Sequence, residues 1–189
     1  MFNGNLEYLI SSLPNLSFSD SETVQQDVKV LFKKYASTSE ASDRLVSILN
    51  EEASKYLSLQ DFQKFESIQL STIHKEQFQN SNIKVVSEFS RFMFQLKSEL
   101  KTFRVARKSE ESFGKISYEL LGELPENPLK AEEYLLDIKW QKLDTLSIGH
   151  YSNLSALVLY KLKLEVLLRW WQFDAEVGFQ VFQQSLNVA

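Results

Sequence analysis

The segment Asn153–Phe173, NLSALVLYKLKLEVLLRWWQF, decides the fold class. Its apolar side chains recur three and four residues apart, at Leu157, Tyr160, Leu164, Leu167 and Trp171. This spacing predicts a helix with one wide apolar face that packs against other helices. The segment contains no motif for a nucleophile, a metal or a phosphate group. We therefore expect an all-α protein, a multi-helix bundle that acts through its surfaces.

The same segment carries a charged row. Lys161, Glu165 and Arg169 follow each other at four-residue spacing, so they share another face of the helix, which Trp170 and Trp171 then close. The row is either a solvated stripe, worth about 0.3–0.5 kcal/mol per pair, or a selective contact row for a protein partner. Two flanking cations are expected to hold Glu165 ionised, which makes a poor general base. These five residues are our candidate partner-binding residues.

The composition indicates a globular helical protein. The chain has 189 residues, of which 43% are apolar and 24% charged, enough for one or two domains with a real core. Five Gly and three Pro are too few for a turn-dense β protein, and 24 aromatic residues (14 Phe, 7 Tyr and 3 Trp) predict an aromatic-rich core or interface. A net charge of −4 argues against nucleic-acid binding, and the absence of Cys excludes disulfides and zinc–cysteine sites.

Nothing in the sequence predicts a membrane span. No apolar run approaches the ~18–20 residues that a spanning helix needs. The first residues lack the basic and apolar regions of a signal peptide. We therefore expect a soluble, cytoplasmic chain.

The N-terminal residues 5–18 are expected to form an extended arm. Leu6, Tyr8 and Ile10 alternate as in a strand, and Pro14 then interrupts the pattern. A single short strand is weak evidence for a sheet. The arm is therefore expected to lie across the helical body.

Helix starts are marked by capping signals at Ser19 with Glu22, Ser58 with Asp61, and Asn127 before Pro128. The longest apolar seam before the C-terminal third comprises Val86, Phe89, Met93, Leu96, Leu100 and Phe103. It predicts a central helix of a bundle. We expect an arm plus helical lobe over 1–108, a looser connection over 109–126, and a C-terminal helical lobe over 127–189, unless all form one continuous domain.

Catalytic and metal sites are not supported by the residues present. His74 and His150 have no acidic partner at ligand spacing, and a small enzyme would need a deep pocket that gathers His150 with two acids. A basic cluster is expected to complement the negative end of the central helix, at Arg104, Arg107 and Lys108. We expect no cofactor, no metal and no enzymatic activity.

Four segments resemble a family of functionally uncharacterised bacterial proteins encoded in V-type ATPase operons. They are YLISSLPNLSF at 8–18, NPLKAEEYLL at 127–136, YKLKL at 160–164 and RWWQFDAEVG at 169–178. The family is similar to the C/d subunit, the helical socket between the rotor ring and the central stalk.

This resemblance implies a non-catalytic accessory or coupling subunit. Its partners would be stalk and rotor-ring subunits, and it would associate peripherally with the inner membrane through the complex. The C/d subunits are longer and built from repeated helical units, and no such repeat is found here. The alternative function is a free-standing helical adaptor or an assembly factor.

Overall fold

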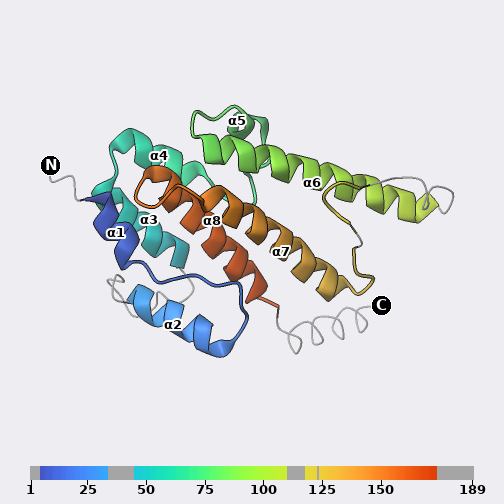
Figure 1. Ribbon diagram of the computed structural model, residues 1–189, viewed down its shortest axis with the longest axis horizontal. Helices are drawn as coiled ribbons and strands as arrows, with labels where there is room; N and C mark the ends of the chain where they lie inside the picture. The colour runs from blue at the N-terminus through green and yellow to red at the C-terminus, as the bar shows by residue number, and fades with distance from the viewer. Residues whose placement is uncertain (1–4, 34–44, 110–117, 123, 174–189) are drawn as a thin grey trace, which may run out of the picture.

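The computed structural model describes residues 5–33, 45–109, 118–122 and 124–173, and their regular elements are all helices (Figure 1). The helices are α1 (Leu6–Ser12), α2 (Glu22–Lys33), α3 (Leu45–Tyr56), α4 (Leu59–Ser67), α5 (Glu76–Gln79), α6 (Lys84–Ser109), α7 (Pro128–Ser147) and α8 (Leu154–Trp170). The predicted all-α bundle is confirmed. In the described part of the chain, no helix is long and apolar enough to cross a bilayer.

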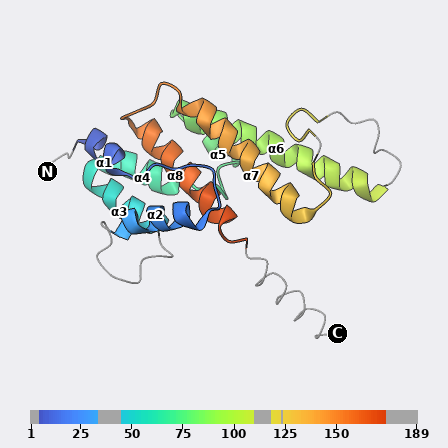
Figure 2. The ribbon, with the colours of Figure 1, turned by 60° about the horizontal axis from the view of Figure 1, so that its bottom comes forward.

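Helix α8 is the centre of the bundle. It pairs antiparallel with α7 and also contacts α1, α3, α4 and α6 (Figures 1 and 2). Its buried apolar residues lie around most of its circumference, at Leu157, Val158, Leu159, Leu162, Leu164, Val166 and Leu167. A helix that is apolar on nearly all sides must be enclosed by others. The heptad spacing predicted one wide apolar face, whereas buried apolar residues surround most of the helix.

Helix α6 buries its predicted seam over its first half. Val86, Phe89, Met93 and Leu96 are at most 3% exposed. Further along, the carboxylate of Glu99 accepts hydrogen bonds from the backbone N–H groups of Leu120 and Leu121, at 2.9 and 3.2 Å. This contact attaches the 118–122 segment to the part of α6 that extends beyond the bundle (Figure 1).

The N-terminal extended arm was predicted wrongly for residues 6–12, which form α1. Asn5 caps this helix by accepting a hydrogen bond from the Glu7 N–H at 3.0 Å. Leu9 and Leu13 are buried, and Leu6 and Ile10 pack against the same core. These four positions have the spacing of a helix face, which competes with the strand-like alternation of Leu6, Tyr8 and Ile10.

Residues 13–21 have no helical structure and cross the helical body as expected of the arm. The Tyr160 hydroxyl donates a hydrogen bond to the Pro14 carbonyl at 2.8 Å. Helix α2 then starts at Glu22 rather than after Ser19, and the Ser21 hydroxyl accepts from the Val24 N–H at 3.4 Å. The cap is therefore two residues later than the sequence signal placed it.

The other two predicted caps are confirmed. The Ser58 hydroxyl accepts from the Asp61 N–H, and the Asn127 side chain accepts from the Leu129 and Lys130 N–H groups. One cluster of buried side chains joins residues from Leu9 to Leu167. The division into lobes at 108 and 127 stays a prediction.

Candidate functional site

Lys161 is buried inside the bundle with 1% of its surface exposed. Its Nζ donates hydrogen bonds to the carbonyls of Phe65 at 2.9 Å and Glu66 at 3.3 Å, and lies 4.6 Å from the Phe65 ring centroid. Both carbonyls belong to the last turn of α4, the negative end of its dipole, where a cation is favourable. Burial lowers the pKa of Lys161, while the nearby carboxylates of Glu165 and Glu66 oppose the shift.

Glu165 lies one turn further along α8 and binds a backbone N–H group of the same segment, whereas Lys161 binds its carbonyl groups. Its carboxylate accepts a hydrogen bond from the Leu70 N–H at 2.5 Å. Burial raises the pKa of Glu165, and the Leu70 N–H and Lys161 oppose the shift. The flanking cations were expected to favour the ionised form of Glu165, and Lys161 does so, but burial has the larger effect on its pKa. Lys161 and Glu165 together attach residues 65–70 to α8, and we call them the α8 clamp.

Arg169 differs from the other two members of the charged row. Its side chain is 55% exposed, its Nε lies 3.6 Å from Glu132 Oε1, and its guanidinium lies 5.4 Å from the Phe173 ring centroid. Lys161 is therefore not part of a solvated stripe, because it contacts the backbone of this chain. The solvated-stripe interpretation does fit Arg169, whose side chain is exposed. The partner-binding role assigned to the row stays a prediction.

The two tryptophans at the end of α8 both hold the N-terminal segment. The Trp170 ring lies 4.1 Å from the Phe18 ring, and the Trp171 Nε1–H donates to the Ser19 carbonyl at 2.9 Å. Both side chains are half-buried. Adjacent residues point in different directions on a helix, and both directions are covered here by residues 18–19.

A cavity of about 560 Å³ adjoins the α8 clamp. Lys161, Glu165 and Arg169 line it, so the structure brings the whole charged row to one concave surface. Lys97 from α6 and Lys139 from α7 also line the cavity. Neither lysine is predicted from the sequence as a site residue, because a single lysine on an amphipathic helix has no spacing signal that distinguishes it from a solvated residue.

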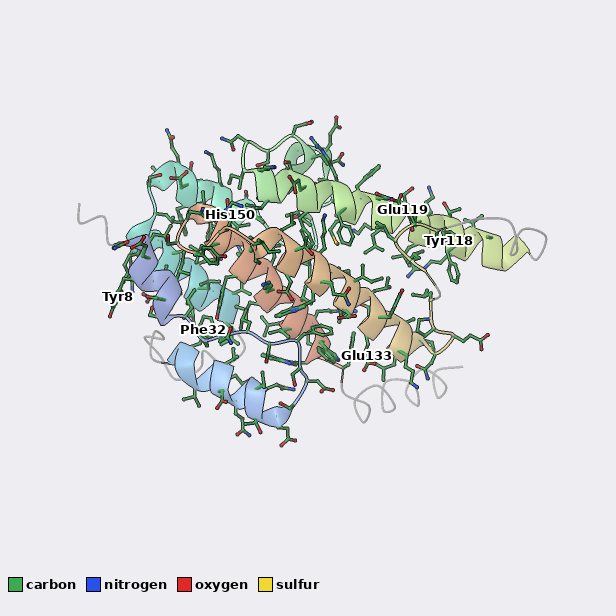
Figure 3. All side chains as sticks on the ribbon, in the orientation of Figure 1. Tyr8, Phe32, Tyr118, Glu119, Glu133 and His150 are labelled. Carbon is green, nitrogen blue, oxygen red and sulfur yellow. The ribbon has the colours of Figure 1, made fainter. Side chains whose placement is uncertain are left out.

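The histidines do not form a catalytic or metal site in the residues that the structure describes. His74 lies at the side chain of Lys97, with 3.0 Å between Nδ1 and Nζ, and burial followed by the charges of Lys97 and Lys75 lowers its pKa. His150, labelled in Figure 3, contacts Asn153. It is absent from the cavity wall. No group of three or more His, Cys, Asp or Glu in the described ranges could hold a metal ion.

Four of the eight large apolar side chains that are exposed in the described residues belong to segments at one end of the bundle. They come from α1, the start of α4 and the α7–α8 turn, three segments that lie at the same end in Figures 1 and 2. The residues of this end surface are Tyr8 (67% exposed), Leu59 (73%), Ile148 (77%) and Tyr151 (76%). Exposed aromatic and aliphatic side chains from several segments are typical of a protein-binding surface.

Searches for related proteins found no family model, no curated protein and no solved structure that matches this chain.

Proposed function

We propose that this protein is a non-catalytic accessory or coupling subunit of a bacterial V-type ATPase. It would work in the manner of the C/d subunit, through contacts with stalk and rotor-ring subunits. Such a subunit needs a stiff body and docking surfaces rather than an active site, because it transmits force by contact area.

The observation that carries the proposal is that the segments with the family resemblance meet in space. Segment 8–18 contacts α8 through Phe18 on Trp170 and through the Tyr160 hydrogen bond to Pro14. Segment 127–136 reaches the same helix through the ion pair of Glu132 with Arg169. The described residues of the four stretches thus belong to one packed unit, although up to 150 residues separate the stretches in sequence, as expected if they resemble the family for a common structural reason. Residues 174–178 of the last stretch lie outside the described residues.

The end surface is the docking site that we propose for the partner subunit. Its four side chains are more than half exposed, whereas Lys161, Trp170 and Trp171 have partners within the chain. Burying a large apolar side chain in an interface contributes about 1.5–3 kcal/mol. We therefore assign the proposed docking site to the end surface, which includes the α7–α8 turn, rather than to the charged row of α8.

The test is a tagged pull-down from gently solubilised membranes of the native host, with mass spectrometry of the bound proteins. Near-stoichiometric recovery of V-type ATPase stalk or rotor-ring subunits is the expected result. The double variant Ile148→Ser/Tyr151→Ser should lose most of this recovery while its thermal unfolding stays unchanged, because both side chains are exposed.

The matched control is Leu129→Ser. Leu129 is 48% exposed and lies at the start of α7, at the opposite end of the helix from the proposed docking turn. It should recover the same partners as the wild type. Recovery of the bait alone, from an extract in which the ATPase is intact, would reject the coupling function and leave a helical adaptor for another partner.

A further inference from the structure

The cavity beside the α8 clamp has an unusual charge for this chain. Four cationic side chains and two carboxylates line it, so its wall carries an excess of two positive charges, although the whole protein has a net charge of −4. The cations are Lys97, Lys139, Lys161 and Arg169, and the carboxylates are Glu132 and Glu165. The protein therefore concentrates positive charge at one concave site.

Two of the four cations are already matched within the chain. Arg169 pairs with Glu132, and Lys161 lies one turn from Glu165 and binds the carbonyls of α4. Lys97 contacts the ring of His74, whose pKa is lowered, so this contact supplies no negative charge. In the described part of the chain, the ammonium of Lys139 has no hydrogen bond or ion pair. Lys97 and Lys139 thus form no ion pair with the described residues, although Glu132 lies near enough to raise the pKa of Lys139.

The charge of Lys139 is disfavoured in the cavity. Burial is the largest effect and lowers its pKa, Glu132 raises it, and repulsion from Arg169 and Lys97 lowers it. An anion in the cavity would reduce this repulsion.

The rest of the wall fits an organic ligand. The lining includes the apolar side chains of Leu70, Met93 and Leu136 as well as the amide of Gln69 and the hydroxyl of Ser71. A volume of about 560 Å³ lies within the range of small-molecule sites, roughly 300–1,000 Å³.

Asn50 also lines the cavity. Its Oδ1 atom is closed to solvent and has no hydrogen-bond partner among the described residues. Because this oxygen does not face the cavity, it carries no argument for a ligand.

We propose that this cavity binds a small organic phosphate, with the phosphate between Lys97 and Lys139 and the organic part against Leu70, Met93 and Leu136. A phosphate monoester carries about −1.5 to −2 charges, which matches the excess of two. Lysine binds phosphate as a point charge, and Arg169, whose planar fork suits carboxylates and phosphates alike, is already paired with Glu132. This inference does not depend on the proposed function.

The test is isothermal titration calorimetry of the full chain with phenyl phosphate, inorganic phosphate and phenol. Phenyl phosphate should bind most tightly, inorganic phosphate more weakly, and phenol not measurably. Lys139→Gln and Lys97→Gln should each weaken phenyl phosphate binding about tenfold or more, the loss expected of one charged hydrogen bond. Amide NMR shifts of Leu70 and Ser71 should report the binding, since both residues line the cavity.

Lys130→Gln is the matched control, because Lys130 is exposed on α7 and absent from the cavity wall. It should bind like the wild type. Equal affinity of phenyl phosphate for the wild type and both cavity variants would overturn the site. Binding of a tetraglutamate peptide without binding of phenyl phosphate would overturn the small-molecule assignment and indicate an acidic protein segment instead. Thermal unfolding of each variant confirms that it is folded before the comparison is made.

Discussion

Replacing Lys161 with Met tests the α8 clamp most directly. The substitution keeps most of the apolar stem but removes the ammonium, and with it the hydrogen bonds to the carbonyls of Phe65 and Glu66. A hydrogen bond from a charged donor contributes about 1.5–3 kcal/mol, and the longer bond to Glu66 belongs at the lower end. The variant also leaves the carboxylate of Glu165 without its neighbouring cation.

One effect opposes this loss. The folded protein no longer bears the cost of burying the ammonium, which is what lowers the pKa of Lys161. The net free energy of unfolding should fall by about 2–4 kcal/mol. For a protein of this size, that corresponds to a decrease in melting temperature of about 5–15 °C.

The assay is urea unfolding followed by far-UV circular dichroism, which gives the free energy and the m value together. Lys130→Met, on the exposed face of α7, should stay within about 0.5 kcal/mol of the wild type. The double variant Lys161→Met/Glu165→Gln should lose less free energy of unfolding than the sum of the two single variants. In the double variant both charges are removed, so no buried charge is left without its partner. A Lys161→Met variant as stable as the control would refute the clamp.

Three further predictions concern neighbouring contacts. Because burial raises the pKa of Glu165 above its unfolded value, its contribution to stability is present below about pH 4.5 and is lost as the pH rises through the folded pKa; urea unfolding of wild type and Glu165→Gln across this range should show their stability difference falling as the pH rises. Trp171→Phe removes the hydrogen bond to the Ser19 carbonyl and should cost about 1 kcal/mol, with faster proteolysis of residues 13–21; unchanged protection would mean that Phe18 on Trp170 suffices. Gly122→Ala should destabilise the protein by about 1–2 kcal/mol in thermal unfolding, because Gly122 has a φ of +50° and a Cβ there would lie 2.9 Å from the Tyr134 hydroxyl; Gly149→Ala, with a positive φ but open space around it, should cost less.

Local signals in the sequence were sufficient for most helices and failed at the N-terminus. The caps at Ser58 and Asn127 and the seam from Val86 to Leu96 were located correctly, because capping and periodicity act within a few residues. Residues 6–13 carry both a strand-like and a helical apolar pattern. Packing of Leu9 into the core decided between them, and that contact is not local.

The charged row on α8 shows the same limit at the candidate site. Its four-residue spacing was visible, and so was its place on one face of a helix. Whether that face meets water or protein depended on residues 65–70, about 95 positions earlier in the chain. The cavity is even harder to predict from the sequence, because Lys97, Lys139 and Asn50 come from three different helices.

By itself the sequence determined the helical class and most helix positions, since these follow from short-range periodicity, capping and residue content. The tertiary structure decided which charges are buried, since the same lysine costs little in water and must find carbonyl partners inside the core. It also decided that α8 is enclosed, that the two tryptophans hold residues 18–19, and that lysines from separate helices line one cavity. Those properties depend on the distances between segments far apart in the chain, which only the folded packing sets.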